Sequence, residues 1–266
     1  MTTKRPTKRR SDVDLPLTAA VASRLEVLTE AGSTNDILSE RARDSPSTPH
    51  LSVVLTDNQT AGRGRLGRSW TSAPGASLAV SVLLRRLPSA ADSRGWIPLA
   101  AGVAMADAIA EQLPDHDVAV KWPNDILVDG RKICGILAQA TQDAVVVGTG
   151  VNTAMTGSEL PVPTATSFAI LGVEADADRL LATYLRALDQ LVAELAGAGD
   201  AVSSGLHAAA TERCATIGLD IRVSLPGDSV LVGRATGLDV DGRLVVQAEG
   251  SDTSISAGDV VHVRPA

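Results

Sequence analysis

The chain has 266 residues, of which 44% are hydrophobic and 21% charged, a composition that is typical of globular proteins and excludes disorder throughout. No run of about 18 apolar residues occurs, so the sequence also excludes a membrane-spanning helix and predicts a soluble protein. The net charge of −7 argues against a general nucleic-acid binder, because binding phosphates requires a basic face.

The one strongly basic segment is the N-terminal tail, which we place at residues 1–16. It carries the cations Lys4, Arg5, Lys8, Arg9 and Arg10. We interpret it as a solvated, disordered tail, and a contact with nucleic acid or a charged partner is the alternative. Charged residues at positions 12, 14, 24 and 26 replace the apolar core of a secretion signal. We therefore expect a cytoplasmic protein in which Cys134 and Cys214 are reduced.

A catalytic domain is predicted over residues 17–217. Residues 17–30 form a short helix or strand, and Ser33 or Thr34 caps a helix that runs to about Ala42. The following elements are a buried strand over 51–56, a glycine- and arginine-rich segment over 62–68, a strand over 78–84 and a helix over 97–113.

Short strands are predicted next, over 118–122, 126–128, 132–139 and 144–151. Asp129-Gly130 is a two-residue hairpin signal between the second and third of these strands. A proline-rich loop over 156–166 leads to two helices. The first has an apolar face made of Leu180, Tyr184, Leu188, Leu191 and Leu195.

From about Gly218 the sequence pattern changes from long helical segments to short strand-like runs. Five short runs, over 221–225, 230–238, 244–248, 254–256 and 260–263, are separated by Pro226-Gly227, Asp241-Gly242 and Gly258. They predict a small β-barrel over residues 218–266. The predicted fold class is therefore α+β, with a mixed β-sheet catalytic domain flanked by helices and a small C-terminal barrel.

The glycine- and arginine-rich segment formally matches the dinucleotide fingerprint through Gly62, Gly64 and Gly67. That fingerprint requires a helix directly afterwards and an acidic residue about 20 positions on, and neither is present. The segment instead resembles an anion cradle, because glycine backbone and the guanidinium groups of Arg63, Arg65 and Arg68 both bind phosphates well. A solvated basic loop is the alternative.

A second candidate segment is Lys121-Trp122-Pro123-Asn124-Asp125. Pro123 ends a strand and presents the amide and the carboxylate beside Lys121. The hairpin turn is expected to bring Arg131 and Lys132 back to the same corner. Cations for developing oxyanions and a carboxylate for Mg²⁺ or a proton suit phosphoryl or acyl transfer. A charged hairpin tip without function is the alternative.

Other polar residues carry weaker signals. Gly148, Gly150 and Asn152 end an apolar strand where backbone could approach a ligand, and Gln59 offers both a donor and an acceptor to a polar ring. The four histidines are scattered without a nucleophile partner, so we interpret them as surface or core residues. Cys134 lies in the middle of a strand and is expected to be buried and inert.

Together, these segments resemble biotin protein ligase. The matching residues, in the order of the family, are Gly-Ser-Thr-Asn (32–35), Gln59, Gly-Arg-Gly-Arg-Leu-Gly-Arg (62–68), Trp70, Lys-Trp-Pro-Asn-Asp (121–125), Arg-Lys-Ile-Cys-Gly-Ile-Leu (131–137) and Gly-Thr-Gly-Val-Asn (148–152). They extend over about 120 residues. The predicted C-terminal barrel also fits the family's small C-terminal domain, and the resemblance implies that this barrel is SH3-like. Single motifs of this kind are weak, whereas five in register favour the anion cradle over a solvated loop.

The resemblance implies two half-reactions: ATP activates biotin to biotinyl-5′-AMP, and a lysine of a biotin carboxyl carrier domain of acyl-CoA carboxylases then accepts the biotin. Biotin is thus a substrate, and Mg²⁺ is expected to accompany ATP. The implied catalytic residues are Lys132, Arg65, Lys121 and Asp125. Biotin-binding residues would be Ser33, Thr34, Asn35, Gln59, Arg63, Gly64, Arg65, Lys132 and Gly135. Adenylate-binding residues would be Gly62, Arg63, Arg65, Arg68, Trp70, Asn124, Lys132 and Asn152.

Individual roles follow from the same resemblance. Arg63 and Arg65 would hold the carboxylate and phosphates together, and Lys132 would stabilise charge on the α-phosphoryl group. Lys121 and Asn124 would hold phosphate or metal. Asp125 is a Mg²⁺ contact or a general base, and the sequence assigns no metal ligand beyond that choice.

One departure concerns the start of the chain. Family members that repress transcription carry an N-terminal helix-turn-helix domain, whereas only 32 residues precede Ser33 here. We therefore expect a ligase without repressor activity, no nucleic-acid or membrane partner, and a monomer. The alternatives are a lipoate-protein ligase, which shares the adenylation chemistry, and a DNA-binding regulator that senses biotinyl-adenylate.

Overall fold

The computed structural model describes residues 14–45, 47–225, 229–256 and 259–262. Residues 1–13 of the predicted tail, the Pro226-Gly227 turn and Gly258 lie outside these ranges. Helix α1 (Pro16–Val21) begins at the last residue of the predicted tail, and Leu15 just before it is buried.

The larger part of the chain is a seven-stranded mixed sheet with the strand order β1-β2-β5-β9-β8-β7-β6. Its strands are β1 (Arg24–Leu28), β2 (Ser52–Thr56), β5 (Ser77–Leu84), β6 (Val118–Lys121), β7 (Asp125–Val128), β8 (Arg131–Ala140) and β9 (Val145–Asn152). β1 and β2 are parallel, and each other neighbouring pair in this sheet is antiparallel. A dinucleotide-binding fold would require a parallel sheet instead.

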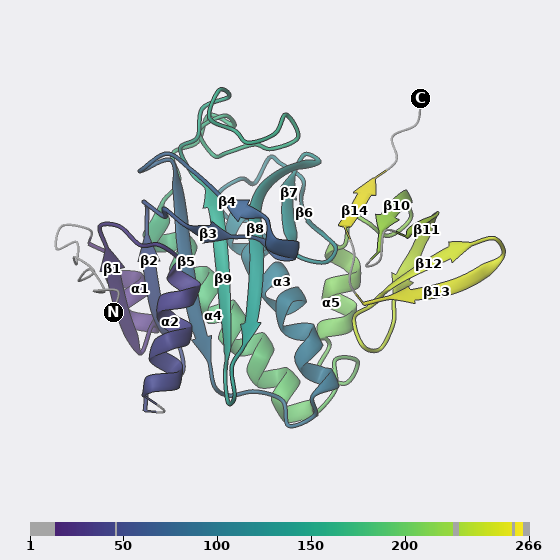
Figure 1. Ribbon diagram of the computed structural model, residues 1–266, viewed down its shortest axis with the longest axis horizontal. Helices are drawn as coiled ribbons and strands as arrows, with labels where there is room; N and C mark the ends of the chain where they lie inside the picture. The colour runs from purple at the N-terminus through teal and green to yellow at the C-terminus, as the bar shows by residue number, and fades with distance from the viewer. Residues whose placement is uncertain (1–13, 46, 226–228, 257–258, 263–266) are drawn as a thin grey trace.

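Helices cover both faces of this sheet (Figure 1). Of the helices that the structure describes, α2 (Thr34–Asp44) covers one face, and α1, α3 (Ile97–Ala110) and α4 (Ala177–Ala198) cover the other. Helix α3 is apolar on nearly all sides and is therefore buried, and it ends three residues before the predicted end at 113. Helix α4 has the predicted apolar face and ends at Gly199, whose φ of 85° stops a helix at little cost.

Two local signals in the sequence are confirmed. The Ser33 side chain caps α2 by accepting a hydrogen bond from the amide of Asp36 at 3.3 Å. Asp129 and Gly130 have φ values of 49° and 73°, as a two-residue hairpin turn between β7 and β8 requires. The first signal places the N-terminus of α2 over the sheet, and the second sets the register of β8.

The C-terminal part is a five-stranded antiparallel sheet with the order β13-β12-β11-β10-β14. Its strands are β10 (Asp220–Ser224), β11 (Val230–Leu238), β12 (Leu244–Ala248), β13 (Ser251–Ile255) and β14 (Asp259–His262). Within the described residues β13 and β14 do not pair, so the SH3-like barrel is not confirmed. The strand predicted at 254–256 begins earlier, because polar residues of β13 pair along the whole of β12.

The two sheets share one hydrophobic core cluster. The indole Nε1 of Trp96 donates to the Val240 carbonyl at 2.9 Å, and that of Trp122 donates to the Gly242 carbonyl at 3.0 Å. Helix α5 (Leu206–Arg213) lies at this junction, next to the C-terminal sheet (Figure 1). Among the described residues, none of the helices is both long and apolar enough to cross a membrane.

Candidate active site

Small residues leave part of the α2 face of the large sheet uncovered. Ala79 of β5, Gly150 of β9, Gly135 of β8 and Asp125 of β7 are neighbours in register across four strands. Three of these four residues have little or no side chain, so space remains above the sheet beside the N-terminus of α2. This row is the floor of a pocket, and its two ends carry different chemistry.

The glycine- and arginine-rich segment crosses this face of the sheet as a loop (Figure 1). It consists of β3 (Gly62–Arg63), a single 3-10 turn η1 (Arg65–Gly67) and β4 (Ser69–Trp70). β3 pairs with β4, and the Gly64 amide donates to the Arg68 carbonyl at 2.7 Å. No helix follows Gly67, in agreement with the anion-cradle interpretation and not with the dinucleotide one.

The side chain of Trp70 lies against the glycine floor. A Cβ atom on Gly150 would come within 2.5 Å of the indole, and one on Gly135 within 3.2 Å. The Nζ of Lys132 lies 5.9 Å from the centroid of the ring. The indole Nε1 is buried and has no hydrogen-bond partner among the described residues. The ring therefore covers the glycines without a polar contact that fixes it.

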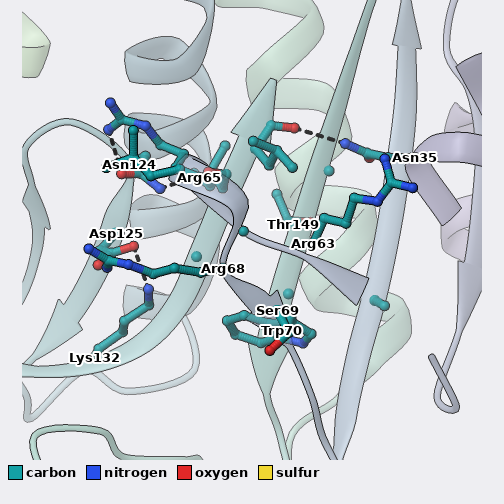
Figure 2. A pocket seen from close by; sticks show the side chains of 18 of the residues that line it. Asn35, Arg63, Arg65, Arg68, Ser69, Trp70, Asn124, Asp125, Lys132 and Thr149 are labelled. Atoms are coloured by element: carbon teal, nitrogen blue, oxygen red, sulfur yellow. Dashed lines mark hydrogen bonds and ion pairs between the residues drawn. The ribbon is translucent and has the colours of Figure 1, made fainter. Parts of the chain in front are cut away.

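One end of the pocket is charged (Figure 2). Lys132 Nζ lies 2.6 Å from Asp125 Oδ1, and Arg65 Nη1 donates to Asn124 Oδ1 at 3.0 Å. Asn124 is itself fixed, because its Nδ2 donates to the Ile136 carbonyl at 2.8 Å. These contacts bring residues of three separate sequence motifs together, as the sequence predicted.

At the other end, the side chains that pack against the sheet are neutral and polar, and the Arg63–Asp36 ion pair lies exposed at the margin. The backbone amide of Thr34 donates to Gln59 Oε1 at 3.0 Å, and Asn35 Nδ2 donates to the Leu137 carbonyl at 3.1 Å. The first turn of α2 supplies Thr34 and Asn35, and the cap residue Ser33 precedes them. All three are more than nine-tenths buried, so this end is set by the packing of α2 on the sheet.

The pocket as a whole is cationic. Its lining includes five cations, namely Arg63, Arg65, Arg68, Lys121 and Lys132. Within the part of the chain that the structure describes, Asp125 is the one carboxylate that lines it. Asp36 at its margin pairs with Arg63 at 3.2 Å, and both side chains are exposed. Such an arrangement favours an anionic ligand.

The structure brings together most of the predicted site residues. Those that line the pocket are Ser33, Thr34, Asn35, Gln59, Arg63, Gly64, Arg65, Arg68, Trp70, Lys121, Asn124, Asp125, Lys132 and Gly135. Gly62 lies in β3, at the start of the loop, where a Cβ would meet Gln59 Nε2 at 2.3 Å. Asn152 is buried at the end of β9, and its Nδ2 donates to the Thr166 carbonyl at 2.9 Å. Neither of these two is in the lining.

One expectation about the charged corner is wrong. Arg131 does not reach it: the side chain is exposed near the hairpin turn and donates to the Pro163 carbonyl at 3.5 Å. The turn lies at the opposite end of β7 from Asp125. Lys132 pairs in register with Leu127, and its side chain is directed into the pocket, where Nζ reaches Asp125.

Sequence reasoning missed Ser81, which is fully buried beneath this pocket. Its Oγ lies 2.6 Å from Asn35 Oδ1 and 2.8 Å from Thr34 Oγ1. A serine within the otherwise apolar run Leu-Ala-Val-Ser-Val-Leu-Leu was the available signal, because a buried hydroxyl needs a partner. Asp36 was missed as well, and its position in the first turn of α2 gave no comparable signal.

The cysteines and histidines have the structural roles that were predicted. Burial raises the pKa of the Cys134 thiol, and the pKa of Cys214 is raised for the same reason. His262 contacts the Thr216 hydroxyl at 3.2 Å, and burial together with the charge of Lys121 lowers its pKa. No histidine is in the pocket lining within the described ranges.

Known proteins are similar to this chain along most of its length. Residues 29–152 match the Biotin/lipoate A/B protein ligase family, and residues 216–263 match the Biotin protein ligase C terminal domain. The chain is 38% identical to a biotin--[acetyl-CoA-carboxylase] ligase of Mycobacterium tuberculosis, over 90% of this chain and 89% of that protein. It is 31% identical to the bifunctional ligase/repressor BirA of Escherichia coli, over 84% of this chain and 69% of that protein.

Solved structures agree with these matches. Biotin protein ligase from Leishmania major in complex with biotinyl-5-AMP is 27% identical, with a TM-score of 0.63 over 88% of this chain and 99% of that one. Biotin protein ligase from Aquifex aeolicus in complex with biotin and ATP is 24% identical, with a TM-score of 0.74 over 91% of this chain and 100% of that one. At 24% identity, the similarity to the Aquifex aeolicus structure is evidence for the fold alone.

Proposed function

The chain belongs to the biotin protein ligase family, and we propose that it joins biotin to a carrier lysine through biotinyl-5′-AMP. One observation carries the proposal: the pocket has a neutral, hydrogen-bonding end at Thr34 and Gln59 and a cationic end at Arg65 and Lys132. Biotin has the matching asymmetry, with a polar ring at one end and a carboxylate at the other.

The reaction has two steps, and each exchanges one bond for another. In the first, a biotin carboxylate oxygen forms a bond to the α-phosphorus of ATP, and the bond to pyrophosphate breaks. In the second, the carrier lysine in its neutral form bonds to the acyl carbon, the bond to AMP breaks, and the lysine nitrogen gives up a proton. Both steps develop negative charge on oxygen, which the cationic end of the pocket would stabilise.

Three cations have the principal roles in this proposal. Arg65 would hold the carboxylate near the α-phosphate, because its forked donors bind two anionic oxygens at once. Lys132 would leave Asp125 and move to the oxygen on which charge develops. Lys121 would bind the departing phosphates. The proximity of their positive charges offsets the repulsion between carboxylate and triphosphate.

Asp125 fits a role with Mg²⁺ that is bound to ATP. Mg²⁺ is usually held by one or two carboxylates together with substrate phosphates, and Asp125 with the neighbouring Asn124 Oδ1 provides oxygen ligands of this kind. When bound, the ion would neutralise phosphate charge. Asp125 would also help to orient Lys132 through their ion pair.

Trp70 and Asn152 remain proposed adenine contacts. The indole already lies over Gly150 without a hydrogen bond among the described residues, so it could shift and stack on a base at small cost. Asn152 Oδ1 is buried and has no partner within the same residues, so it could accept from an amino group. Both roles require the indole to move away from the end of β9.

The partner and the organisation of the chain are further proposals. A biotin carboxyl carrier domain would be the acceptor, as the name of the Mycobacterium relative implies. Residues 17–217 would be the catalytic domain and residues 218–266 a domain with SH3-like topology, and its β14 contributes Val260 to the pocket. We also propose a monomeric, cytoplasmic enzyme, consistent with two free, buried cysteines.

The decisive experiment is biotin-dependent exchange of labelled pyrophosphate into ATP, with Mg²⁺ present and with lipoate and no acid as controls. Exchange with biotin alone is the expected result. Exchange with lipoate instead would show that lipoate is the substrate, while the adenylation mechanism would still hold. Exchange with neither acid, from folded protein, would contradict the ligase and leave the biotinyl-adenylate sensor as the next hypothesis.

A further inference from the structure

The side chain of Asn35 lies flat on Gly148 beneath the N-terminus of α2. A Cβ atom on Gly148 would come within 2.2 Å of Asn35 Oδ1, so no larger residue fits there without moving the amide. In the sheet register Gly148 of β9 is flanked by Ser81 of β5 and Leu137 of β8. Asn35 contacts both flanking residues, and this places it over the middle of three strands.

The hydrogens of this cluster can be assigned by counting donors. The Leu137 carbonyl can only accept, so Nδ2 of Asn35 must face it and Oδ1 must face Ser81. An amide oxygen can only accept, so the single proton of Ser81 must be donated to Asn35 Oδ1. Any other choice would leave two acceptor oxygens 2.6 Å apart without a proton between them.

The same count then determines the state of the Thr34 hydroxyl. Ser81 Oγ is also the donor to Thr34 Oγ1, at 2.8 Å, so its proton is shared between two acceptors. The Thr34 hydroxyl therefore accepts from Ser81 and directs its own proton at Gln59 Oε1, at 3.2 Å. The Thr34 backbone amide donates to the same Gln59 oxygen at 3.0 Å, so the lone pair that remains on Thr34 Oγ1 is an acceptor.

We propose that Ser81 and Gly148 are positioning residues that fix Asn35 and thereby make the Thr34 hydroxyl an acceptor toward the pocket. The chemical consequence is selectivity for a ligand that presents an N–H donor at this end. The ureido ring of biotin has such donors, and the dithiolane ring of lipoate has none. This inference rests on the proposed function, in which Thr34 and Gln59 bind the ring of biotin.

Burial makes the assignment rigid. Ser81 is 0% exposed and Thr34 is 3% exposed, so both hydroxyls are largely shielded from bulk water. A site whose polar groups are committed in advance rejects ligands with the wrong donor pattern strongly, because the mismatch leaves buried groups unpaired. The residues beneath the pocket would thus determine which ring it accepts, and the cations at the other end would not.

The test uses Ser81→Ala and Gly148→Ala in the full chain, with kinetics of pyrophosphate exchange and biotin affinity measured by calorimetry. Each variant is expected to raise the KM for biotin about tenfold, the ratio for one or two lost neutral hydrogen bonds. The kcat and the KM for ATP should stay within about twofold of wild type, because the cationic end is intact.

A second readout tests the polarity of Thr34 directly. Two cyclic carbamate analogues of biotin each carry oxygen in place of one ring N–H. Wild type should discriminate against one of them by at least about 100-fold, as expected for a site with a buried acceptor. Ser81→Ala should reduce that discrimination about tenfold, because the Thr34 hydroxyl is then no longer oriented by Ser81 and can turn its proton toward the ligand.

Matched controls separate this role from loss of packing. Ser52→Ala removes another buried strand serine of the same sheet, whose Oγ donates to the Pro49 carbonyl at 2.8 Å away from the pocket. Gly197→Ala adds a Cβ where no atom lies within 4 Å. Both controls should keep wild-type KM values, and thermal melts should show all four variants folded at the assay temperature.

The possible failures are distinguishable. If wild type shows no exchange with biotin, the proposed function is wrong. If wild type is active but Ser81→Ala and Gly148→Ala keep the wild-type KM for biotin and the same analogue discrimination, the positioning role is wrong. Equal losses in kcat and in both KM values would also overturn it, because they would indicate a general structural effect.

Discussion

The two ends of the pocket differ in how they are held. At the Thr34 end, Thr34 and Asn35 are buried and neutral, and they contact Gln59 and the sheet through hydrogen bonds. At the Lys132 end, the cations are partly exposed, and Lys132 and Asp125 have 33% and 21% exposed side chains. The neutral end is rigid before any ligand arrives, whereas the charged end has side chains that can move.

This difference separates recognition from chemistry. A fixed, buried donor and acceptor pattern selects a ligand and affects binding of ground state and transition state alike, so its loss should raise KM. Cations near the reacting atoms act on charge that develops only in the transition state, so their loss should lower kcat. Variants at the charged end, and at the contacts that join it to the C-terminal sheet, test whether the two ends of the pocket differ in this way.

The largest effect is expected for Lys132→Ala. The Lys132 ammonium is the cation paired with Asp125 above the glycine floor, and its removal should lower kcat for pyrophosphate exchange by about 100- to 1,000-fold, as for one lost oxyanion donor. The KM for biotin should change little. Arg131→Ala, which removes the adjacent exposed cation outside the pocket, is the control and should keep normal turnover.

Near-normal turnover of Lys132→Ala would refute the assignment of the main catalytic role to this residue. A large rise in the KM for biotin with kcat unchanged would remove the distinction between the two ends. Steady-state exchange kinetics over a range of biotin concentrations separate these outcomes.

A smaller effect is expected for Arg65→Ala. Arg65 spans from the loop to Asn124, and loss of its charge-assisted contacts should speed dissociation of the adenylate by about 10- to 100-fold. Biotin without ATP should bind within a few-fold of wild type. Trapping experiments with labelled biotin measure adenylate release, and calorimetry measures biotin binding. Equal losses of both would indicate that the loop has a purely structural role, and exposed Arg222→Ala is the control.

Support of the charged end by the C-terminal part can be tested with Thr216→Val. The Trp122 amide donates to Thr216 Oγ1 at 3.1 Å in a buried position. Without the hydroxyl this buried amide loses its oxygen acceptor, so the free energy of unfolding in urea should fall by about 1–3 kcal/mol. Thr211→Val is matched, because that hydroxyl is buried and has no partner among the described residues, and it should cost little. A loss in both variants of the same size would refute the role of this contact.

The smallest effect is a pH dependence of stability at His262. Burial, and then the charge of Lys121, lower its pKa below the usual 6.5, so the unfolded chain binds a proton there that the folded chain resists. Stability should therefore decline as pH falls below about 6.5 and stop declining below the folded pKa. His262→Gln should flatten this part of the curve of unfolding free energy against pH. An unchanged slope between pH 7 and 5 would contradict the assignment.

Much of the fold was predictable because local signals agree with the tertiary structure. The helix cap at Ser33, the Asp129-Gly130 turn and the apolar strands along the large sheet appear where the sequence places them. The residues that line the pocket were also predictable from their motifs. The errors lie at the ends of elements. At β13, for example, polar residues form strand because they pair with β12, and the local sequence pattern does not show that pairing.

Arg131 and Lys132 show why the motif alone could not predict which residues reach the site. The two cations are adjacent in sequence, and only the register of β8 against β7 decides that Lys132 reaches Asp125 and Arg131 does not. Likewise, Ser81 is one polar residue in an apolar run until the sheet brings it beneath α2. Contacts between distant segments depend on register, which a single sequence does not contain.

The sequence by itself determined the chemical inventory of this protein: the arginine loop, the Lys121–Asp125 segment, the glycines of β9 and the elements that carry them. The spacing of apolar and turn residues is a local property, so it can be recognised in the sequence without knowing which strands pair. Only the tertiary structure decided which groups meet, because hydrogen-bond polarity and pocket shape arise from packing across β5, β9 and β8. The orientation of the Thr34 hydroxyl, which accepts from Ser81 and donates to Gln59, is of this kind, since it depends on contacts between separate segments of the chain.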